Sequence, residues 1–261
     1  MTYLQPPSAD TPRRPEPWAV WPTFGISVLI LLAFFITGAV LTFFYLAIEF
    51  AQNPALADPL AQQKFILGIQ KNGNLIAWSS LASGFAGLGA IGLAIKLKKG
   101  WKFKDYLNFQ VPKWHSFLIW NVLLIVTILI EEQIAKFFAK ESDFLKEAFA
   151  SEQSHPVWLF LAIVIMAPLF EEFMFRGFMF KGMEKSWLGV LGTVLVTSFI
   201  WAIIHVQYDL FFMGIIFTLG LLLGYARHVT KSIWIPTSMH ALNNAFAMAS
   251  LAGWIHIGIF C

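Results

Sequence analysis

Long apolar runs, each about 20 residues in length, alternate with short polar segments along most of this chain. A helix needs about 20 apolar residues to cross the hydrocarbon core of a bilayer, and core helices of soluble domains are usually shorter. Charged residues make up only 13% of the 261 residues and hydrophobic residues 58%. A typical soluble domain has about 25% charged residues. The pattern therefore predicts an all-α fold, a polytopic transmembrane helical bundle.

We expect about seven spans in this bundle. They cover residues 21–48, 75–95, 115–135, 157–180, 187–206, 210–226 and 233–259. The first span would be about 42 Å long, so it must tilt or protrude from the bilayer. Polar residues inside the later spans predict a polar cavity in the C-terminal half of the bundle.

The distribution of basic residues predicts the orientation of the bundle. The segment 96–114 holds six lysines and one acid, Asp105, and loops rich in Lys and Arg stay on the cytoplasmic side. Further basic residues fall on the same side in a seven-span arrangement: Lys181, Lys185, Arg227 and Lys231. The N-terminus is therefore expected to be cytoplasmic and the C-terminus outside. We expect a multi-pass integral membrane protein, in a bacterial cytoplasmic (inner) membrane.

Four regions follow from these spans, with no internal repeat and no soluble domain. They are a cytoplasmic tail over 1–20, N-terminal transmembrane helices and loops over 21–154, a membrane domain that carries most of the polar span residues over 155–250, and the end of the last span over 251–261. Segment 49–74 has the composition of a loop. The single cysteine, Cys261, excludes an intrachain disulfide. The small net charge of +3 gives no reason to expect a nucleic-acid partner.

Two adjacent carboxylates and one guanidinium interrupt the fourth predicted span. A charge at bilayer depth costs at least about 2.5 kcal/mol, so it needs a partner, water or a function. At helical spacing Glu172 and Arg176 can pair, whereas Glu171 points about 100° away. Pro168 cannot donate to the carbonyl of Val164 and should kink the span just before the acids. One paired and one free carboxylate suit acid–base chemistry, although a helix end whose charges meet lipid headgroups is an equally simple explanation.

Two histidines interrupt two further spans. His205 ends the fifth predicted span and has Trp201 four residues earlier on the same face, and His240 has Asn244 four residues later. A single histidine in a span is more often a satisfied hydrogen bond between helices. Together with Glu171, however, these residues predict one shared, hydrated cavity. There a carboxylate can deprotonate water, a histidine can position that water or bind a metal, and a His–Asn pair can stabilise an oxyanion.

Two other acidic motifs favour structural roles. Glu131 and Glu132 form a second acid pair at the outer end of the third span, where we expect Glu132 to form a surface ion pair with Lys136. Tyr208-Asp209 matches one half of an intramembrane aspartyl protease site, but the Gly-x-Gly-Asp half is absent from the chain.

Small residues predict where helices pack closely. The stretch 87–92 matches GxGxxG, but it lies inside a span without a preceding strand, so it is not a dinucleotide-binding motif. With Ser83 and Gly84 it predicts a helix-packing surface, and Gly220 and Gly224 predict another.

The three polar motifs together resemble those of the CAAX-protease and bacteriocin-processing (CPBP, Abi) family of intramembrane proteases. The family pattern is Glu-Glu-x-x-x-Arg, then Phe-x-x-x-His, then His-x-x-x-Asn. The first and third motifs are intact here, from Glu171 to Arg176 and from His240 to Asn244. In the second, Trp201 stands where the family usually has Phe, which keeps an aromatic ring and changes only the shape of that wall. The resemblance covers about residues 155–250.

This resemblance implies an intramembrane endopeptidase whose peptide or protein substrate is reached from the membrane, with the lipid bilayer as its other partner. Glu171 would be the general base that activates water, and His205 would help to hold that water. His240 and Asn244 would stabilise the oxyanion. Structural support would come from Glu172, Arg176 and Trp201.

The use of a metal stays open. Members of the family are discussed both as metalloenzymes and as metal-free glutamate proteases, and no cofactor is certain from the residues. Zinc commonly has three protein ligands and an open position, and Glu171, His205 and His240 could supply those ligands. Asn244 beside His240 favours an oxyanion pair over a tightly bound metal.

Two other functions stay open as well. A non-catalytic membrane immunity or peptide-binding protein could use the same fold. Such a protein has no need to keep all four of the candidate catalytic residues, Glu171, His205, His240 and Asn244. A proton-coupled transporter also places Glu and His inside spans, but it should show repeat symmetry between its halves.

The depth of His205 conflicts with a shared cavity. Counted from the inner ends of their helices, Glu171 lies about 15 Å, His240 about 10 Å and His205 about 27 Å into the membrane. For the three to meet, the fifth helix must start near Thr193 or tilt strongly, with residues 186–192 as a connecting loop.

Overall fold

The computed structural model describes residues 15–140, 144–150 and 155–254, and within them every regular element is a helix. Five stretches are long and apolar enough to cross a membrane: α1 (Val20–Gln52), α3 (Gly73–Leu97), α5 (Trp114–Phe137), the composite helix Pro156–Met183 and α11 (Leu210–Thr230). The shorter α10 (Gly189–Ile203) and α12 (Trp234–Leu251) occupy the fifth and seventh predicted spans. These helices confirm the predicted polytopic bundle.

The last predicted span is longer than the helix that occupies it. α12 ends at Leu251, eight residues before the predicted end, and residues 255–259 lie outside the described part of the chain. Its mixed composition explains the difference, because apolarity alone cannot mark the end of a helix that also carries His240, Asn243 and Asn244.

The segment 49–74, predicted as a loop, is largely helical. It contains a 3₁₀ turn (Pro54–Ala57), α2 (Pro59–Gly68) and a second 3₁₀ turn (Ile69–Lys71). Asp58 caps α2 by accepting a hydrogen bond from the Ala61 amide at 2.8 Å, and Pro59 fits the first helical position because it needs no donor there. Two other connections contain the short helices α4 (Phe103–Tyr106) and α6 (Phe144–Ala150).

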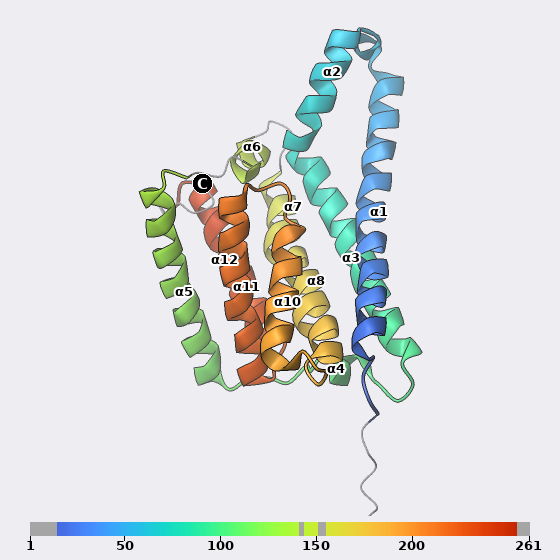
Figure 1. The fold of residues 1–261 in the computed structure, drawn as a ribbon. Helices are drawn as coiled ribbons and strands as arrows, with labels where there is room; N and C mark the ends of the chain where they lie inside the picture. The colour runs from blue at the N-terminus through green and yellow to red at the C-terminus, as the bar shows by residue number, and fades with distance from the viewer. Residues whose placement is uncertain (1–14, 141–143, 151–154, 255–261) are drawn as a thin grey trace, which may run out of the picture.

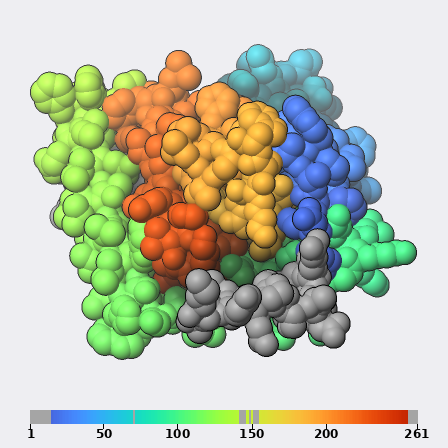
Figure 2. All heavy atoms as spheres, turned by 60° about the horizontal axis from the view of Figure 1, so that its bottom comes forward, coloured from blue at the N-terminus to red at the C-terminus, as the bar shows by residue number. Residues whose placement is uncertain are grey.

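The helices are arranged with α5 on one flank of the bundle and the pair α1 and α3 on the other (Figures 1 and 2). Helices α7 to α12 lie between these flanks. α1 has 33 residues, about 50 Å of helix, and it rises with α2 beyond the ends of the other helices (Figure 1). The first span is therefore long enough to extend past the ends of the other helices.

Small residues bring α3 into direct contact with the helix that carries the acid pair. A Cβ atom at Gly84 would lie 2.3 Å from Met166, and one at Gly87 would lie 2.2 Å from Phe170. Neither position can hold a larger residue without displacing its neighbour. α10 and α11 meet in the same way at Gly220 and Gly224. The packing surface at Gly220 and Gly224 is confirmed, and that on α3 is confirmed at Gly84 and Gly87, whereas a Cβ atom at Gly89 would meet nothing within 4 Å.

The second acid pair is buried, which corrects the prediction that it lies at the surface. Glu131 and Glu132 are 6% and 4% exposed. Lys136 pairs with Glu132 at 2.5 Å as expected, but Glu131 accepts a hydrogen bond at 2.6 Å from the hydroxyl of Thr218 in α11. The sequence did not show that α11 would cover this face of α5.

Candidate active site

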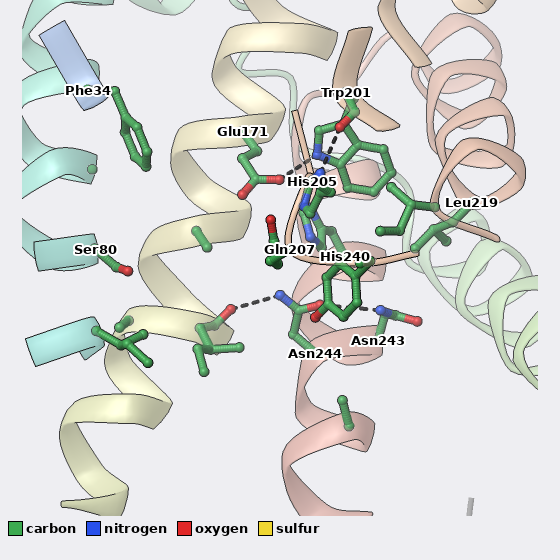
Figure 3. Close-up of a pocket in the computed structure, with 18 residues that line it drawn as sticks. Phe34, Ser80, Glu171, Trp201, His205, Gln207, Leu219, His240, Asn243 and Asn244 are labelled. Atoms are coloured by element: carbon green, nitrogen blue, oxygen red, sulfur yellow. Dashed lines mark hydrogen bonds between the residues drawn. The ribbon is translucent and has the colours of Figure 1, made fainter. Parts of the chain in front are cut away.

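One cavity of about 230 Å³ brings together the polar residues singled out in the sequence. Glu171, Trp201, His205, His240 and Asn244 all line it (Figure 3). They come from three separate stretches of chain: the helix Pro156–Met183, the end of α10 with the turn that follows it, and α12. The predicted convergence of Glu171, His205 and His240 is therefore present.

His205 lies in the turn that follows α10, and the start of this helix does not meet the condition set by the sequence analysis. This helix begins at Gly189, whose φ of +58° makes the turn before it, and ends at Ile203. His205 follows in a turn that folds back on the helix, because its amide donates to the Ala202 carbonyl at 3.1 Å. The helix therefore starts two residues later than predicted and earlier than Thr193, and the predicted loop 186–192 is helical from Gly189 onward.

Two π-helical turns interrupt the helix that carries the acid pair. They cover Leu161–Met166 and Phe173–Met179 and leave α8 (Ala167–Glu172) between them, with α7 (Pro156–Phe160) before and α9 (Phe180–Met183) after. The Ala167 amide donates to the carbonyl of Ala162, five residues back. Wide turns of this kind inside helices are frequently found at functional sites.

The first π turn and Pro168 together leave one backbone carbonyl without a partner in its own helix, and a side chain of α12 bonds to it. In the five-residue register the carbonyl of Ile163 should accept from residue 168, but proline has no N–H group. The side-chain amide of Asn244 donates to this carbonyl instead, at 2.8 Å. The sequence predicted that Pro168 leaves the carbonyl of Val164 without its helix donor. In the structure the affected carbonyl is that of Ile163, so the prediction is wrong by one residue. Asn244 also accepts from the Asn243 amide at 3.2 Å.

Glu172 anchors a buried network below the cavity. Its Oε1 atom accepts hydrogen bonds from Arg176 and from Nδ1 of His240, both at 2.9 Å. The side chains of Glu172 and Arg176 are fully buried. Arg176 also donates to the carbonyl of Gly220 at 3.1 Å and lies 4.4 Å over the Trp201 ring. The predicted ion pair is present, and His240 is an additional partner that its spacing did not reveal.

Glu171 remains outside this ion pair and lines the cavity. It is half-buried, and its Oε2 atom accepts a hydrogen bond from the indole N–H of Trp201 at 2.5 Å. Its other carboxylate oxygen is turned away from Trp201 (Figure 3). A phenylalanine could not donate this bond. The change from Phe to Trp in the second motif therefore alters the hydrogen bonding of the candidate base as well as the shape of the wall, contrary to the expectation from the sequence.

The two histidines have their ring orientation fixed in the same manner. Nδ1 of His205 lies 2.7 Å from the Trp201 carbonyl, and Nδ1 of His240 faces the Glu172 carboxylate. Both partners accept hydrogen bonds, so Nδ1 carries the proton on each ring. In a neutral imidazole the Nε2 atom then offers a lone pair to water or to a metal.

This donor chemistry does not amount to a metal site. Among the described residues, no group of three or more His, Cys, Asp or Glu side chains lies close enough to hold a metal ion. The three candidate ligands Glu171, His205 and His240 share a cavity but do not surround one point. We therefore derive no step through a metal.

Four polar cavity residues were missed in the sequence, and one of them is Ser80 in α3. Asn243 is 5% exposed and lies beside the predicted Asn244, and Gln207 and Tyr208 come from the turn between α10 and α11. The Tyr208 ring stacks on His205 at a centroid distance of 6.3 Å. Burial raises the pKa of the Tyr208 hydroxyl, and the nearby Glu171 charge raises it further, so the hydroxyl stays protonated. Gln207, Tyr208 and Asn243 lie close to the histidine motifs in the sequence, and Tyr208 also belongs to the Tyr208-Asp209 motif that the sequence analysis set aside.

Asp209 has a structural role, as the absent partner motif suggested. It caps α11 (Leu210–Thr230) by accepting from the Phe212 amide at 3.0 Å, and it pairs with Lys140 at 2.8 Å. The hydrogen bond from Lys140 and that from the helix amide lower the pKa of Asp209.

Comparison with known proteins supports the resemblance seen in the motifs. Residues 153–246 match the family described as "Type II CAAX prenyl endopeptidase Rce1-like". The matched segment begins just before α7 and ends within α12, so it includes every residue of the three motifs. Searches of curated proteins and of solved structures gave no match.

Proposed function

We propose that this chain, whose residues 153–246 are Rce1-like, is an intramembrane endopeptidase that uses Glu171 to activate water. The observation that carries the proposal is the contrast between two adjacent carboxylates. Glu172 is fully buried and bonded to Arg176 and His240, whereas Glu171 faces a polar cavity. Of these two carboxylates, only Glu171 can exchange a proton with a molecule in that cavity.

The proposed reaction is the hydrolysis of one peptide bond. Glu171 takes a proton from water as the water oxygen bonds to the carbonyl carbon, which gives a tetrahedral intermediate with a negatively charged oxygen. As the intermediate collapses, the C–N bond breaks and Glu171 returns the proton to the leaving amine. The carboxylate is then restored, and one water has been consumed.

The surrounding residues position the reactants. Trp201 holds one oxygen of Glu171 and leaves the other for water. Nε2 of His205 accepts a hydrogen bond from that water, since its Nδ1 proton is committed to a backbone carbonyl. Asn244 keeps one amide hydrogen beyond the one given to Ile163, and it donates this hydrogen to the oxyanion. Donors of this kind typically contribute about 10²–10³-fold.

The experiment is a comparison of two isosteric variants. Purified protein is incubated with a mixture of quenched-fluorescent peptides, with and without attached lipid. Glu171→Gln keeps the shape of the side chain but cannot take up a proton, so turnover should fall at least about 10⁴-fold. Glu131→Gln is the matched control, because Glu131 is also a carboxylate in a long helix but accepts its hydrogen bond from Thr218, away from the cavity. It should cleave at the wild-type rate.

The same experiment addresses the alternative of a non-catalytic immunity or peptide-binding protein. Cleavage by Glu171→Gln at the wild-type rate would show that Glu171 is not the base. If wild-type protein binds peptides at the cavity but cleaves none of them, the peptide-binding function is the better account of the same residues.

A further inference from the structure

The two ends of the bundle differ in charge. The three connections at one end, residues 98–113, 184–188 and 231–233, contain seven lysines and two acids. The three at the other end, residues 53–72, 138–155 and 204–209, contain four lysines and six acids. Connections rich in lysine stay in the cytoplasm. The lysine-rich end, at the bottom of Figure 1, is therefore the cytoplasmic end.

The cavity is closed toward this cytoplasmic end. Every residue from Glu172 to Phe180 is buried, whereas buried and accessible residues alternate between Phe160 and Glu171. The fully buried Arg176 and the Trp201 ring, 4.4 Å from it, pack together beneath Glu171. A packed layer of about two helical turns therefore separates the candidate base from the cytoplasmic side.

The cavity extends toward the opposite end on α3, on α12 and on the helix Pro156–Met183, where its lining runs from Glu171 back to Ala162. On α3, which starts at that end, it is lined by Ile76, Ser80 and Gly84 and by nothing nearer the lysine-rich connection. On α12, which ends there, its lining starts at His240 and continues to Ala247. The turn at that end contributes Gln207, an exposed residue.

The walls of the cavity indicate what it can accept. Glu171 is the only acidic residue in the lining of the cavity, and no lining residue is Lys or Arg. Apolar side chains such as Phe34 and Ile216 alternate with the amides of Asn243 and Asn244. Such walls suit an extended, uncharged and partly apolar segment, whose backbone the amides can bond.

We propose that this site is entered from the extracytoplasmic side, so that its substrates are uncharged peptide segments presented at the outer surface of the membrane. The proposal rests on the proposed function for the cleavage itself, but the side of entry follows from charge and packing alone. A peptide in the cytoplasm would have to cross the buried layer between Glu172 and Phe180 to reach Glu171.

The side of entry is tested first by labelling, in a Cys261→Ser background that removes the single native thiol. Val206 and Val111 form a matched pair, because both lie in connections and are 78% and 89% exposed at opposite ends of the bundle. A membrane-impermeant maleimide on intact cells should label Val206→Cys and should label Val111→Cys only after lysis. The reverse pattern would overturn the proposal. Gln207→Cys, at the cavity itself, should behave as Val206→Cys does.

The second test is cleavage of a membrane-impermeant peptide by sealed vesicles. Right-side-out vesicles should cleave it directly, and inverted vesicles only after detergent is added. Cleavage by intact inverted vesicles alone would overturn the outer entry while leaving the peptidase function standing. If detergent-solubilised protein cleaves no peptide, the proposed function fails, and the labelling pattern still decides on which side the cavity opens.

Discussion

The chain contains the same acidic pattern twice, and only the second copy lies at the candidate site. In α5 and in α8, two adjacent glutamates are followed by a base four residues after the second. In each copy the second glutamate pairs with that base, at 2.5 Å to Lys136 and at 2.9 Å to Arg176. In each copy the first glutamate accepts a hydrogen bond from another helix.

The difference lies in what the neighbouring helices contribute. Lys136 is 60% exposed, and Glu131 meets a threonine. Arg176 is fully buried, and Glu171 meets Trp201 in a cavity with two histidines. Helical spacing therefore fixes which acid pairs with the base. It does not decide which copy becomes a site, because that depends on residues far away in the sequence.

The largest loss of stability is expected when the base of the second copy, Arg176, is removed. Arg176→Ala leaves Glu172 buried without its cation, so the free energy of unfolding should fall by about 3–5 kcal/mol. Unfolding in mixed detergent measures this. Arg176→Lys keeps the positive charge but lacks the guanidinium nitrogen that donates to the Gly220 carbonyl. Its free energy of unfolding should therefore lie between those of the wild type and Arg176→Ala. Wild-type stability of Arg176→Ala would remove the structural role of the pair.

These contacts also show how far the sequence could lead. The spans, the Glu172–Arg176 pair and the shared cavity followed from apolar length, from helical spacing and from the cost of polar groups in lipid. The bond from His240 to Glu172 joins residues 68 positions apart, and no local pattern encodes it. Asn244 finds Ile163 only because of a π turn, which is a property of the backbone rather than of residue type.

The next largest effect should come from Asn244→Ala. Loss of an oxyanion donor lowers turnover by about 10²–10³-fold. The Ile163 carbonyl also loses its partner, which should cost about 0.5–1.5 kcal/mol of stability. Thr237→Ala in the same helix removes only a bond to the carbonyl four residues back, so it should keep full activity. If Asn244→Ala lowers stability alone, its role is to hold α12 in place and not to bind the oxyanion.

A smaller effect is expected when the hydrogen-bond donor to the first glutamate of each copy is removed. Trp201→Phe keeps an aromatic ring but removes the donor to Glu171. A hydrogen bond to a charged group contributes about 1.5–3 kcal/mol, so turnover should fall about 10- to 100-fold. Thr218→Val makes the equivalent change at Glu131 and should affect stability only. The dependence of kcat on pH should change for Trp201→Phe and not for Thr218→Val.

The smallest effect is expected for Lys136→Ala, and it is the most sensitive test of the comparison. Lys136 keeps 60% of its side chain exposed, while Glu132 keeps only 5%. If the exposure of the base governs the strength of the pair, water and ions take the place of the lysine beside Glu132. The free energy of unfolding then falls by less than about 1 kcal/mol. If burial of the acid governs it, Lys136→Ala should approach the loss seen for Arg176→Ala. Unfolding of both variants in one detergent decides between these accounts. A near-equal loss would mean that the two copies differ in chemistry but not in stability, and that only the residues of the cavity distinguish the candidate site.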